Sequence, residues 1–530
     1  MFNENDGKML DSCRPLHAAF LKPVAGAGLK TRIVGRYMSR EAGHTAKISG
    51  GVRFERLFHR AEGAAVMGTP LKLFGIALTV AMGGFLVGFD ATVISGAVPF
   101  IRDYFDLGST AGTLKLGWAV SSLGWGAMAG NLSAGPLSDR FGRKTVLLLT
   151  AALFLASSLS AALATSFPLF IVARIAGGLS VGAAILIAPM YIAEIAPARR
   201  RGSLVSINQL MIVIGISVSF FSNYFLLSLG AQSWRWMLGV QSLPAALYFL
   251  LLYGVPESPR WLISTGRGAK ARAVLASIHG PGDAQVEMDL IQESLVNKPR
   301  RAGVRDLLSG RLKRMLLFGL GIAFFQQATG INAIFYYLPT IFAQAGGELS
   351  SAFAQSVLVG LVNVGMTFVA IWLIDRAGRR PLLCVGVAGM AVSLLTISWA
   401  FYAGHDPNAG APFGHERIVL LAIIAYVACF AISLGPVMWV LLSEIFPNEQ
   451  RAAAISVVGF WNSLVSATIT LVFPAELAAF GPGGTFLAYG LVAAVGFVFL
   501  SALAPETRGR SLEELEGMLV GPMRLPKALP

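Results

Sequence analysis

The chain has 530 residues, of which 55% are hydrophobic and only 13% are charged. Soluble globular proteins carry about 25% charged residues, so this composition argues against a soluble fold. The net charge of +14 comes largely from Lys and Arg clusters between apolar stretches, which indicates membrane topology rather than nucleic-acid binding.

The first 66 residues are polar and net basic, with no periodicity that predicts a domain. An apolar run begins only after Met67. We expect residues 1–66 to be either disordered or an extension that results from a misassigned start codon.

Twelve largely uncharged stretches follow, each of about 20 residues or more and therefore long enough to cross a bilayer as a helix. They predict an all-α integral membrane protein. In chain order the predicted spans are 71–98, 115–136, 145–165, 168–193, 204–229, 236–255, 315–344, 352–374, 382–403, 418–443, 453–475 and 483–504.

The linkers between these spans predict the topology. Linkers after even-numbered spans are rich in Lys and Arg, whereas those after odd-numbered spans are short or poor in them. By the positive-inside rule, both termini and the long linker 256–314 are cytoplasmic. We therefore expect a first six-helix bundle at 67–255, a second at 315–505 and a cytoplasmic tail at 506–530.

The two halves of the chain repeat each other in their linkers. "DRFGRK" after span two matches "DRAGRR" after span eight, and "EIAPARRR" after span four matches "EIFPNEQR" after span ten. "PES" after span six matches "PET" after span twelve, and all three offsets are about 235 to 250 residues. A duplicated six-span unit is typical of secondary transporters that bind substrate between the halves.

The repeated linkers carry acidic as well as basic residues, which positive-inside topology alone does not require. They predict a cytoplasmic gate that closes in one state and opens in another. The alternative is a set of topology-fixing charges with incidental partners. The gate residues are Asp139, Arg143, Glu194 and Arg201 in the first half, and Asp375, Arg379, Glu444 and Arg451 in the second.

Only two ionisable residues lie well inside the predicted spans, Asp90 in span one and Arg174 in span four. Counted from the outer ends of their spans, they lie about eight and about six residues deep, so they can pair. Intramembrane charges are costly and usually mark substrate or proton pathways. We predict that Asp90 and Arg174 couple proton binding to transport; a static ion pair between the two spans is the alternative.

Neutral polar side chains gather near the middle of the later spans. Amides and phenols both donate and accept hydrogen bonds, which suits an uncharged sugar or polyol, although each amide alone could simply join two helices. A helix break is expected at Gly435 and Pro436. The candidate substrate-binding residues are Gln209, Gln326, Gln327, Asn332, Tyr336, Asn363, Trp439 and Asn462.

From about Lys72 to Leu515 the chain contains, in order, "GFDATVISGA", "DRFGRK", "RIAGGLSVG", "PMYIAEIAPARRRG", "NQLMIVIG", "PESPRWL", "QQATGINAIFYY", "DRAGRRP", "GPVMWVLLSEIFP" and "PETRGRSLEELE". On these motifs the chain resembles the sugar porter family of the major facilitator superfamily. Within this family the chain resembles bacterial proton-coupled pentose and hexose symporters.

The resemblance implies twelve helices in two pseudo-symmetric six-helix bundles, alternating access, a central sugar site and short cytoplasmic helices in 256–314. It implies that Asp90 is the proton-coupling acid, that Arg174 is its partner, and that sugar contacts Gln209, Gln326, Gln327, Asn332, Asn363 and Trp439. Two positions depart from the family pattern. Val87 replaces an aromatic residue, and the amide expected directly before Trp461 falls after it, at Asn462.

We therefore expect a secondary active transporter that imports a neutral monosaccharide, a pentose or hexose, together with protons. A facilitative sugar or inositol uniporter and, less favoured, a transporter-like nutrient sensor are the alternatives; only about 25 residues follow Pro505, a short tail for a sensor. An enzyme is not expected, because all six histidines lie outside the spans and the three cysteines lack metal-ligand spacing.

The expected energy source is the proton gradient, with no cofactor and no metal. We expect a monomer that crosses the membrane several times. A bacterial inner membrane is expected because the outer loops contain no N-x-[ST] sequon.

Overall fold

The computed structural model describes residues 69–197, 200–280, 282–296, 306–308, 310–404, 415–447 and 450–507. The expectations for residues 1–66 and for the tail beyond Thr507 lie outside this part of the chain. The described residues form helices joined by short turns.

The first half contains the helices of spans one to six, and span six is interrupted at Gln241. Their bounds are α3 (Thr69–Tyr104), α4 (Thr110–Phe141), α5 (Arg143–Ala162), α6 (Phe167–Ile195), α7 (Arg201–Leu226), α8 (Ser233–Val240) and α9 (Ser242–Tyr253). A short 3-10 turn, η1 (Leu227–Gln232), joins α7 to α8.

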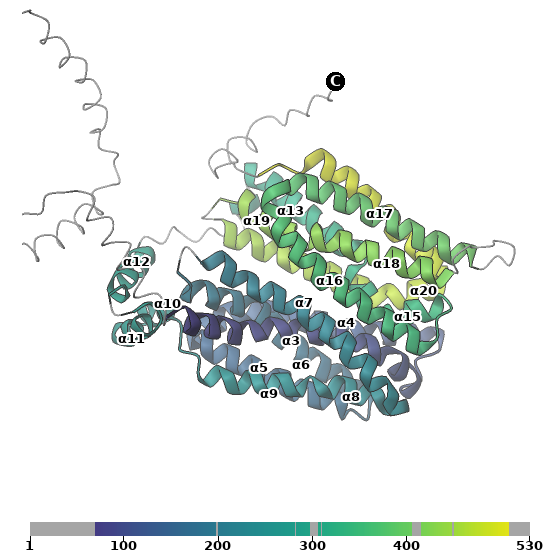
Figure 1. The fold of residues 1–530 in the computed structure, drawn as a ribbon, viewed down its shortest axis with the longest axis horizontal. Coiled ribbons are helices and arrows are strands. Elements are labelled where there is room, and N and C mark those ends of the chain that lie inside the picture. The colour runs from purple at the N-terminus through teal and green to yellow at the C-terminus, as the bar shows by residue number, and fades with distance from the viewer. Residues whose placement is uncertain are drawn as a thin grey trace, which may run out of the picture. The chain divides into compact units, whose positions relative to one another are not determined.

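The linker between the halves folds into three short helices, α10 (Pro259–Ser264), α11 (Gly268–His279) and α12 (Ala284–Val296). They lie together at one end of the long helices (Figure 1). We call this end the linker face and the other end the opposite face.

The second half begins after the 3-10 turn η2 (Asp306–Leu308). Span seven consists of three pieces, α13 (Gly310–Ala328), α14 (Ile331–Tyr336) and α15 (Leu338–Gln344). The other helices are α16 (Leu349–Ala377), α17 (Arg379–Ala403), α18 (His415–Ile432), α19 (Leu434–Ile445) and α20 (Arg451–Leu503).

The described chain contains nine helical stretches long and apolar enough to cross a membrane. Two of them, Arg201–Tyr253 and Ala453–Leu503, have 53 and 51 residues, whereas one crossing needs about 20. Each of these stretches turns at a glycine with positive φ, Gly230 and Gly481 respectively. With these two counted as two crossings each, the glycine-rich α4 completes twelve spans. The predicted all-α, twelve-span fold is confirmed.

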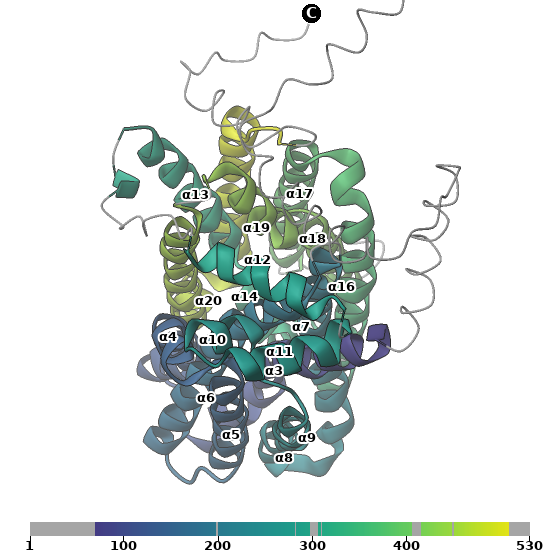
Figure 2. The ribbon, with the colours of Figure 1, turned by 90° about the vertical axis from the view of Figure 1, so that its left-hand side faces the viewer.

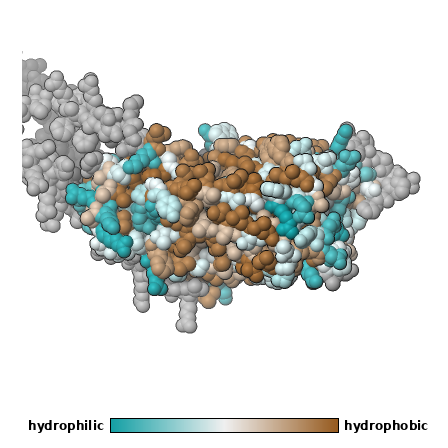
Figure 3. Space-filling view, turned by 90° about the horizontal axis from the view of Figure 1, so that it is seen from below, coloured by the Kyte–Doolittle hydropathy of each residue, from teal (hydrophilic) through white to brown (hydrophobic). Residues whose placement is uncertain are grey.

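The two halves form two bundles that lie side by side, α3 to α9 in one and α13 to α20 in the other (Figures 1 and 2). The surface shows a broad apolar belt between two ends richer in polar residues (Figure 3). This distribution matches a bilayer that surrounds the middle of the helices, with the polar ends in water.

The bundles meet along two seams, α4 on α20 and α7 on α16. At the second seam the Ser217 hydroxyl donates a 2.7 Å hydrogen bond to the carbonyl of Gly360. The half-helices α14 and α15 also pack against α3, whereas none of the closest helix pairs in the described chain joins α13 or α19 to the first bundle. The halves are therefore closed together on the side of the opposite face.

Candidate functional site: a buried ion pair and a central amide network

Asp90 on α3 and Arg174 on α6 form a buried ion pair. Their side chains are only 2% and 3% exposed, and Arg174 Nη1 lies 2.5 Å from Asp90 Oδ1. The pairing predicted from their depths in the spans is present. Gly177 makes room for it, because a Cβ there would lie 3.0 Å from Asp90 Oδ2 and 2.5 Å from Ser157 Oγ.

Part of this ion pair stays without hydrogen bonds. Asp90 Oδ2 and Arg174 Nε and Nη2 are buried and have no partner within the described residues. Tyr336, at the end of α14, lies within electrostatic reach of both charges. Since α14 belongs to the second half, this phenol places the other bundle beside the ion pair.

Four of the predicted substrate-binding residues meet in one network between span seven and α20. Asn462 Nδ2 donates to Gln326 Oε1 at 2.7 Å, and Gln327 Nε2 lies 3.2 Å from Asn462 Oδ1. Asn332 Nδ2 lies 2.9 Å from Gln327 Oε1. Asn462 therefore faces the amides of span seven, although it is displaced by one residue from the family pattern.

Two further groups complete the network. Asn332 Nδ2 also donates to Ser466 Oγ at 2.7 Å, and Gln326 Nε2 donates to the carbonyl of Leu434 at 2.8 Å. Leu434 follows the break of span ten, which falls at Ser433, two residues before the expected Gly435 and Pro436. Ser466, one turn beyond Asn462 on α20, was not predicted from the sequence.

The remaining candidates form no described hydrogen bond with this network. Gln209 on α7 is exposed, Trp439 on α19 is 41% exposed, and Asn363 on α16 is buried. No described hydrogen bond joins Gln209, Asn363, Trp439 or Tyr336 to the network. Trp439 lies beside α20, because a Cβ on Gly459 would be 3.8 Å from its ring.

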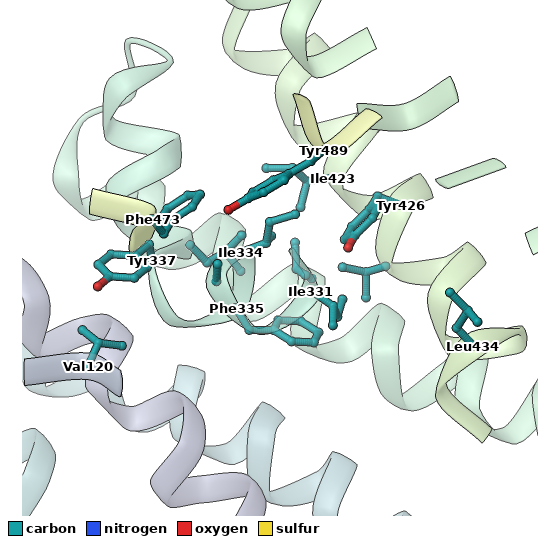
Figure 4. Close-up of a cluster of buried hydrophobic side chains, with 14 of the residues drawn as sticks. Val120, Ile331, Ile334, Phe335, Tyr337, Ile423, Tyr426, Leu434, Phe473 and Tyr489 are labelled. Carbon is teal, nitrogen blue, oxygen red and sulfur yellow. The ribbon is translucent and has the colours of Figure 1, made fainter. Parts of the chain in front are cut away.

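Span seven bends at Gly330, where the backbone adopts φ 86°. The ring of Tyr489 fills the space beside this glycine, so that a Cβ there would lie 2.8 Å from the ring. The Tyr489 hydroxyl bonds to Glu476 Oε2 at 2.7 Å. Figure 4 shows Tyr489 and Phe473 beside the segment that carries Ile331 and Ile334.

Glu476 lies near the end of span eleven, one residue beyond the predicted bound of that span. The predicted span ended at residue 475, but α20 continues as regular helix to its kink at Gly481. The break of span seven at Gly330 was also missed; the adjacent Thr329 and Gly330 were the only sequence signal for it.

At the linker face of the first half, Arg143 holds several helix ends together. Its guanidinium makes two 3.1 Å bonds to the Glu194 carboxylate, and Nη1 lies 3.3 Å from Asp139 Oδ1. The backbone N–H groups of Arg143 and Lys144 donate to Glu257 Oε1 at 2.9 and 3.1 Å. The network thus joins α4, α5, α6 and the start of the linker.

The second half repeats this arrangement. Arg379 Nη2 lies 2.9 Å from Glu444 Oε1, and the N–H groups of Arg379 and Arg380 each donate at 3.1 Å to Glu506. In both halves a glycine precedes the arginine, Gly142 with φ 93° and Gly378 with φ 90°. A Cβ at either glycine would clash with Glu257 or Glu506. We did not predict the roles of these two glutamates, although the repeated Pro-Glu-Ser/Thr was a signal for them.

Two of the predicted gate residues, Arg201 and Arg451, do not join these networks. Within the described chain, no ion pair involves Arg201, which is exposed, or Arg451, whose Nε donates to the carbonyl of Phe446. The side chain of Asp375 lies outside the described residues. Each network lies within one half, and no described ion pair crosses between the halves.

The described residues contain no group of three or more His, Cys, Asp or Glu side chains that could hold a metal ion. Two repeated six-span bundles, a neutral amide network between helices and a buried ion pair are the parts of a secondary transporter. This is the class of protein that the fold and the site define.

Comparison with known proteins narrows the class. The family described as "Sugar (and other) transporter" matches residues 76–519. The D-xylose-proton symporter of Escherichia coli is 37% identical over 480 residues, covering 84% of this chain and 95% of that protein. The arabinose-proton symporter of Bacillus subtilis is 35% identical over 453 residues, covering 84% of this chain and 94% of that protein.

Among solved structures, the inward open conformation of the xylose transporter XylE from E. coli superposes with a TM-score of 0.73 at 34% identity, covering 84% of this chain and 99% of that one. The chain belongs to the sugar porter family of the major facilitator superfamily, a family of transporters rather than enzymes.

Proposed function

We propose that this protein imports a neutral monosaccharide, a pentose or hexose, together with protons by alternating access. One observation carries the proposal: a buried Asp90–Arg174 pair lies in the same molecule as a site built from uncharged amides. Amides recognise hydroxyl groups without demanding a charged substrate, whereas the carboxylate supplies a proton-binding group. Xylose and arabinose symporters among the relatives support this assignment.

The coupling follows from the electrostatics of Asp90. Arg174 is the counter-charge of Asp90, and a buried carboxylate is costly without such a partner. A movement that alters the contact between Asp90 and Arg174 would therefore change the affinity of Asp90 for a proton. Tyr336 brings α14 of the second bundle beside this pair, and α14 also carries Asn332 of the amide network. Substrate binding and proton binding would thus act on the same short helix.

The residues that bind sugar would be Gln326, Gln327, Asn332 and Asn462, with Ser466 in support. Gln209, Asn363, Tyr336 and Trp439 would join them when the bundles close around the substrate. The Arg143 and Arg379 networks would serve as the cytoplasmic gate by bracing the helix ends of each bundle, so that each bundle moves as a rigid body.

We further propose that the linker face is cytoplasmic, with both termini on that side, and that the protein acts as a monomer in a bacterial inner membrane. The bundles would comprise residues 67–255 and 315–505, joined by the linker 256–314. Transport would need no cofactor and no energy source besides the proton gradient.

The test is uptake of labelled pentoses, hexoses and inositols into proteoliposomes, with and without a proton uncoupler. We expect accumulation of at least one neutral sugar, its loss with the uncoupler, and uncoupler-resistant counterflow. Uncoupler-resistant uptake that only equilibrates would instead identify a uniporter. Sugar binding without counterflow would identify a sensor.

A further inference from the structure

A second cavity, separate from the amide network, lies near the opposite face between α3, α4, α15 and the bend of α20. Its volume is about 490 Å³, within the range of small-molecule pockets. Arg102 and Asp103 at the end of α3 are exposed at its rim, as is Gln344 at the end of α15. The cavity therefore opens toward the opposite face.

Two hydroxyl groups in the wall of this cavity have no hydrogen-bond partner. Tyr337 is only 1% exposed, and neither its hydroxyl nor Thr340 Oγ1 forms a hydrogen bond with any described residue. The Tyr337 ring packs on Phe473 at 5.1 Å, and Figure 4 shows its hydroxyl pointing away from the other labelled aromatic side chains. Both residues line the cavity, Tyr337 directly before α15 and Thr340 within its first turn.

The chemistry of the wall indicates what it can hold. A buried hydroxyl without a partner is unfavourable, so a ligand that supplies donors and acceptors is stabilised there. Arg102 and Asp103 carry opposite charges and give the rim no net charge. Leu116, Pro474 and Leu477 provide apolar wall. A small neutral molecule with several hydroxyls and exposed C–H groups matches this combination.

We propose that this cavity is a second binding site, specific for neutral sugars or polyols, that receives substrate before it reaches the amide network. The inference rests on the proposed function and on the cytoplasmic location of the linker face. The helix α14 connects the two sites, because Asn332 of the amide network lies on α14 and Tyr337 directly follows the end of this helix. Substrate would pass along α14 from one site to the other.

The first test is uptake by Thr340→Val, which is nearly isosteric, and by Tyr337→Phe/Thr340→Val. Loss of one or two hydrogen bonds should raise the KM for external sugar about 3- to 10-fold, with the maximal rate within about twofold of wild type. Thr468→Val is the matched control, because the exposed Thr468 on α20 bonds only to the carbonyl of Leu464 in its own helix. An unchanged KM, or a fall in maximal rate alone, overturns the proposal.

The second test measures binding directly, so that the outer site is judged even if transport fails. Saturation-transfer NMR in detergent uses D-xylose, D-glucose and myo-inositol with Gln327→Ala, which weakens the amide network. We expect a weak signal with at least one of them that disappears when Tyr337→Phe and Thr340→Val are added. A signal that persists in the triple variant, or no signal with Gln327→Ala, means that the cavity binds no sugar and overturns the proposal. Absence of all sugar transport by the wild type would refute the proposed function instead.

Discussion

Asp90 is the residue whose chemistry sets the energetics of transport. Replacement by Asn keeps the shape of the side chain but removes the proton-binding group and the charge that faces Arg174. We expect Asp90→Asn to lose uncoupler-sensitive accumulation while it retains counterflow within about tenfold of wild type. Proteoliposome uptake with an imposed pH gradient measures both.

The matched control for this substitution is Asp289→Asn, which changes an exposed carboxylate on α12 that bonds only to Gln285. It should accumulate substrate as the wild type does. Gradient-driven accumulation by Asp90→Asn would show that Asp90 is only one half of a static ion pair.

Glu476 and Tyr489 form a second residue-scale unit, which supports the bend of span seven. Tyr489→Phe keeps the ring against Gly330 but leaves the Glu476 carboxylate without its hydroxyl partner. We expect the unfolding temperature to fall by a few degrees, since a hydrogen bond to a charged group contributes about 1.5–3 kcal/mol. Thermal unfolding in detergent measures this shift.

A double-mutant cycle with Glu476→Gln separates the hydrogen bond from the effect of either change alone. The coupling between the two positions should be about 1.5–3 kcal/mol. Independent effects of the two substitutions would mean that the contact contributes nothing to stability.

At the scale of elements, the best-predicted features are those marked by several neighbouring residues in the sequence. The spans were visible because a helix that crosses lipid needs a long apolar stretch. The Asp90–Arg174 contact was predictable because position along a helix fixes depth in the membrane. The roles of Glu257 and Glu506 were missed, because their partners are backbone N–H groups, which no side-chain pattern marks.

The helix breaks show the same distinction between features marked by neighbouring residues and features that depend on distant ones. Gly435 and Pro436 signal the break of span ten in the local sequence. The space beside Gly330, in contrast, is filled by the ring of Tyr489, which is more than 150 residues away in sequence. The contact of Asn462 with Gln326 likewise depends on how α20 is rotated in the folded bundle. Tertiary packing decides both features.

The linker-face networks lead to an element-scale prediction. Glu257→Gln removes the negative charge of a carboxylate whose oxygen accepts hydrogen bonds from the N–H groups at the start of α5. A negative charge at this place also stabilises the N-terminus of the helix. We expect a lower unfolding temperature and uptake reduced about 3- to 10-fold, with a comparable effect from Glu506→Gln in the second half. Thermal unfolding and initial uptake rates measure both quantities.

Glu293→Gln on α12 is the control for this pair, because Glu293 is exposed and has no described partner. It should match the wild type. If Glu257→Gln behaved like this control, the network would not brace the first bundle.

At the scale of the whole molecule, transport requires that the two bundles separate and rejoin along their seams. At the α4–α20 seam Gly117 approaches the backbone of α20 so closely that a Cβ would lie 1.9 Å from the carbonyl oxygen of Leu471. A methyl group there should hold the bundles apart near the opposite face. We therefore expect Gly117→Ala to reduce uptake at least about tenfold, since close-packed interfaces do not absorb such an overlap without backbone shifts.

Gly135 on the same helix gives the matched control, because a Cβ there meets no atom within 4 Å. Gly135→Ala should transport at the wild-type rate. Alanine favours helix over glycine at position 117, whereas at position 135 its Cβ is disfavoured by the following Pro136. A loss of transport by Gly117→Ala that Gly135→Ala does not show therefore reports the seam and not helix propensity. Equal transport by Gly117→Ala and Gly135→Ala, with equal unfolding temperatures, would contradict this prediction. It would mean that the bundles do not pivot on the contact between Gly117 and Leu471.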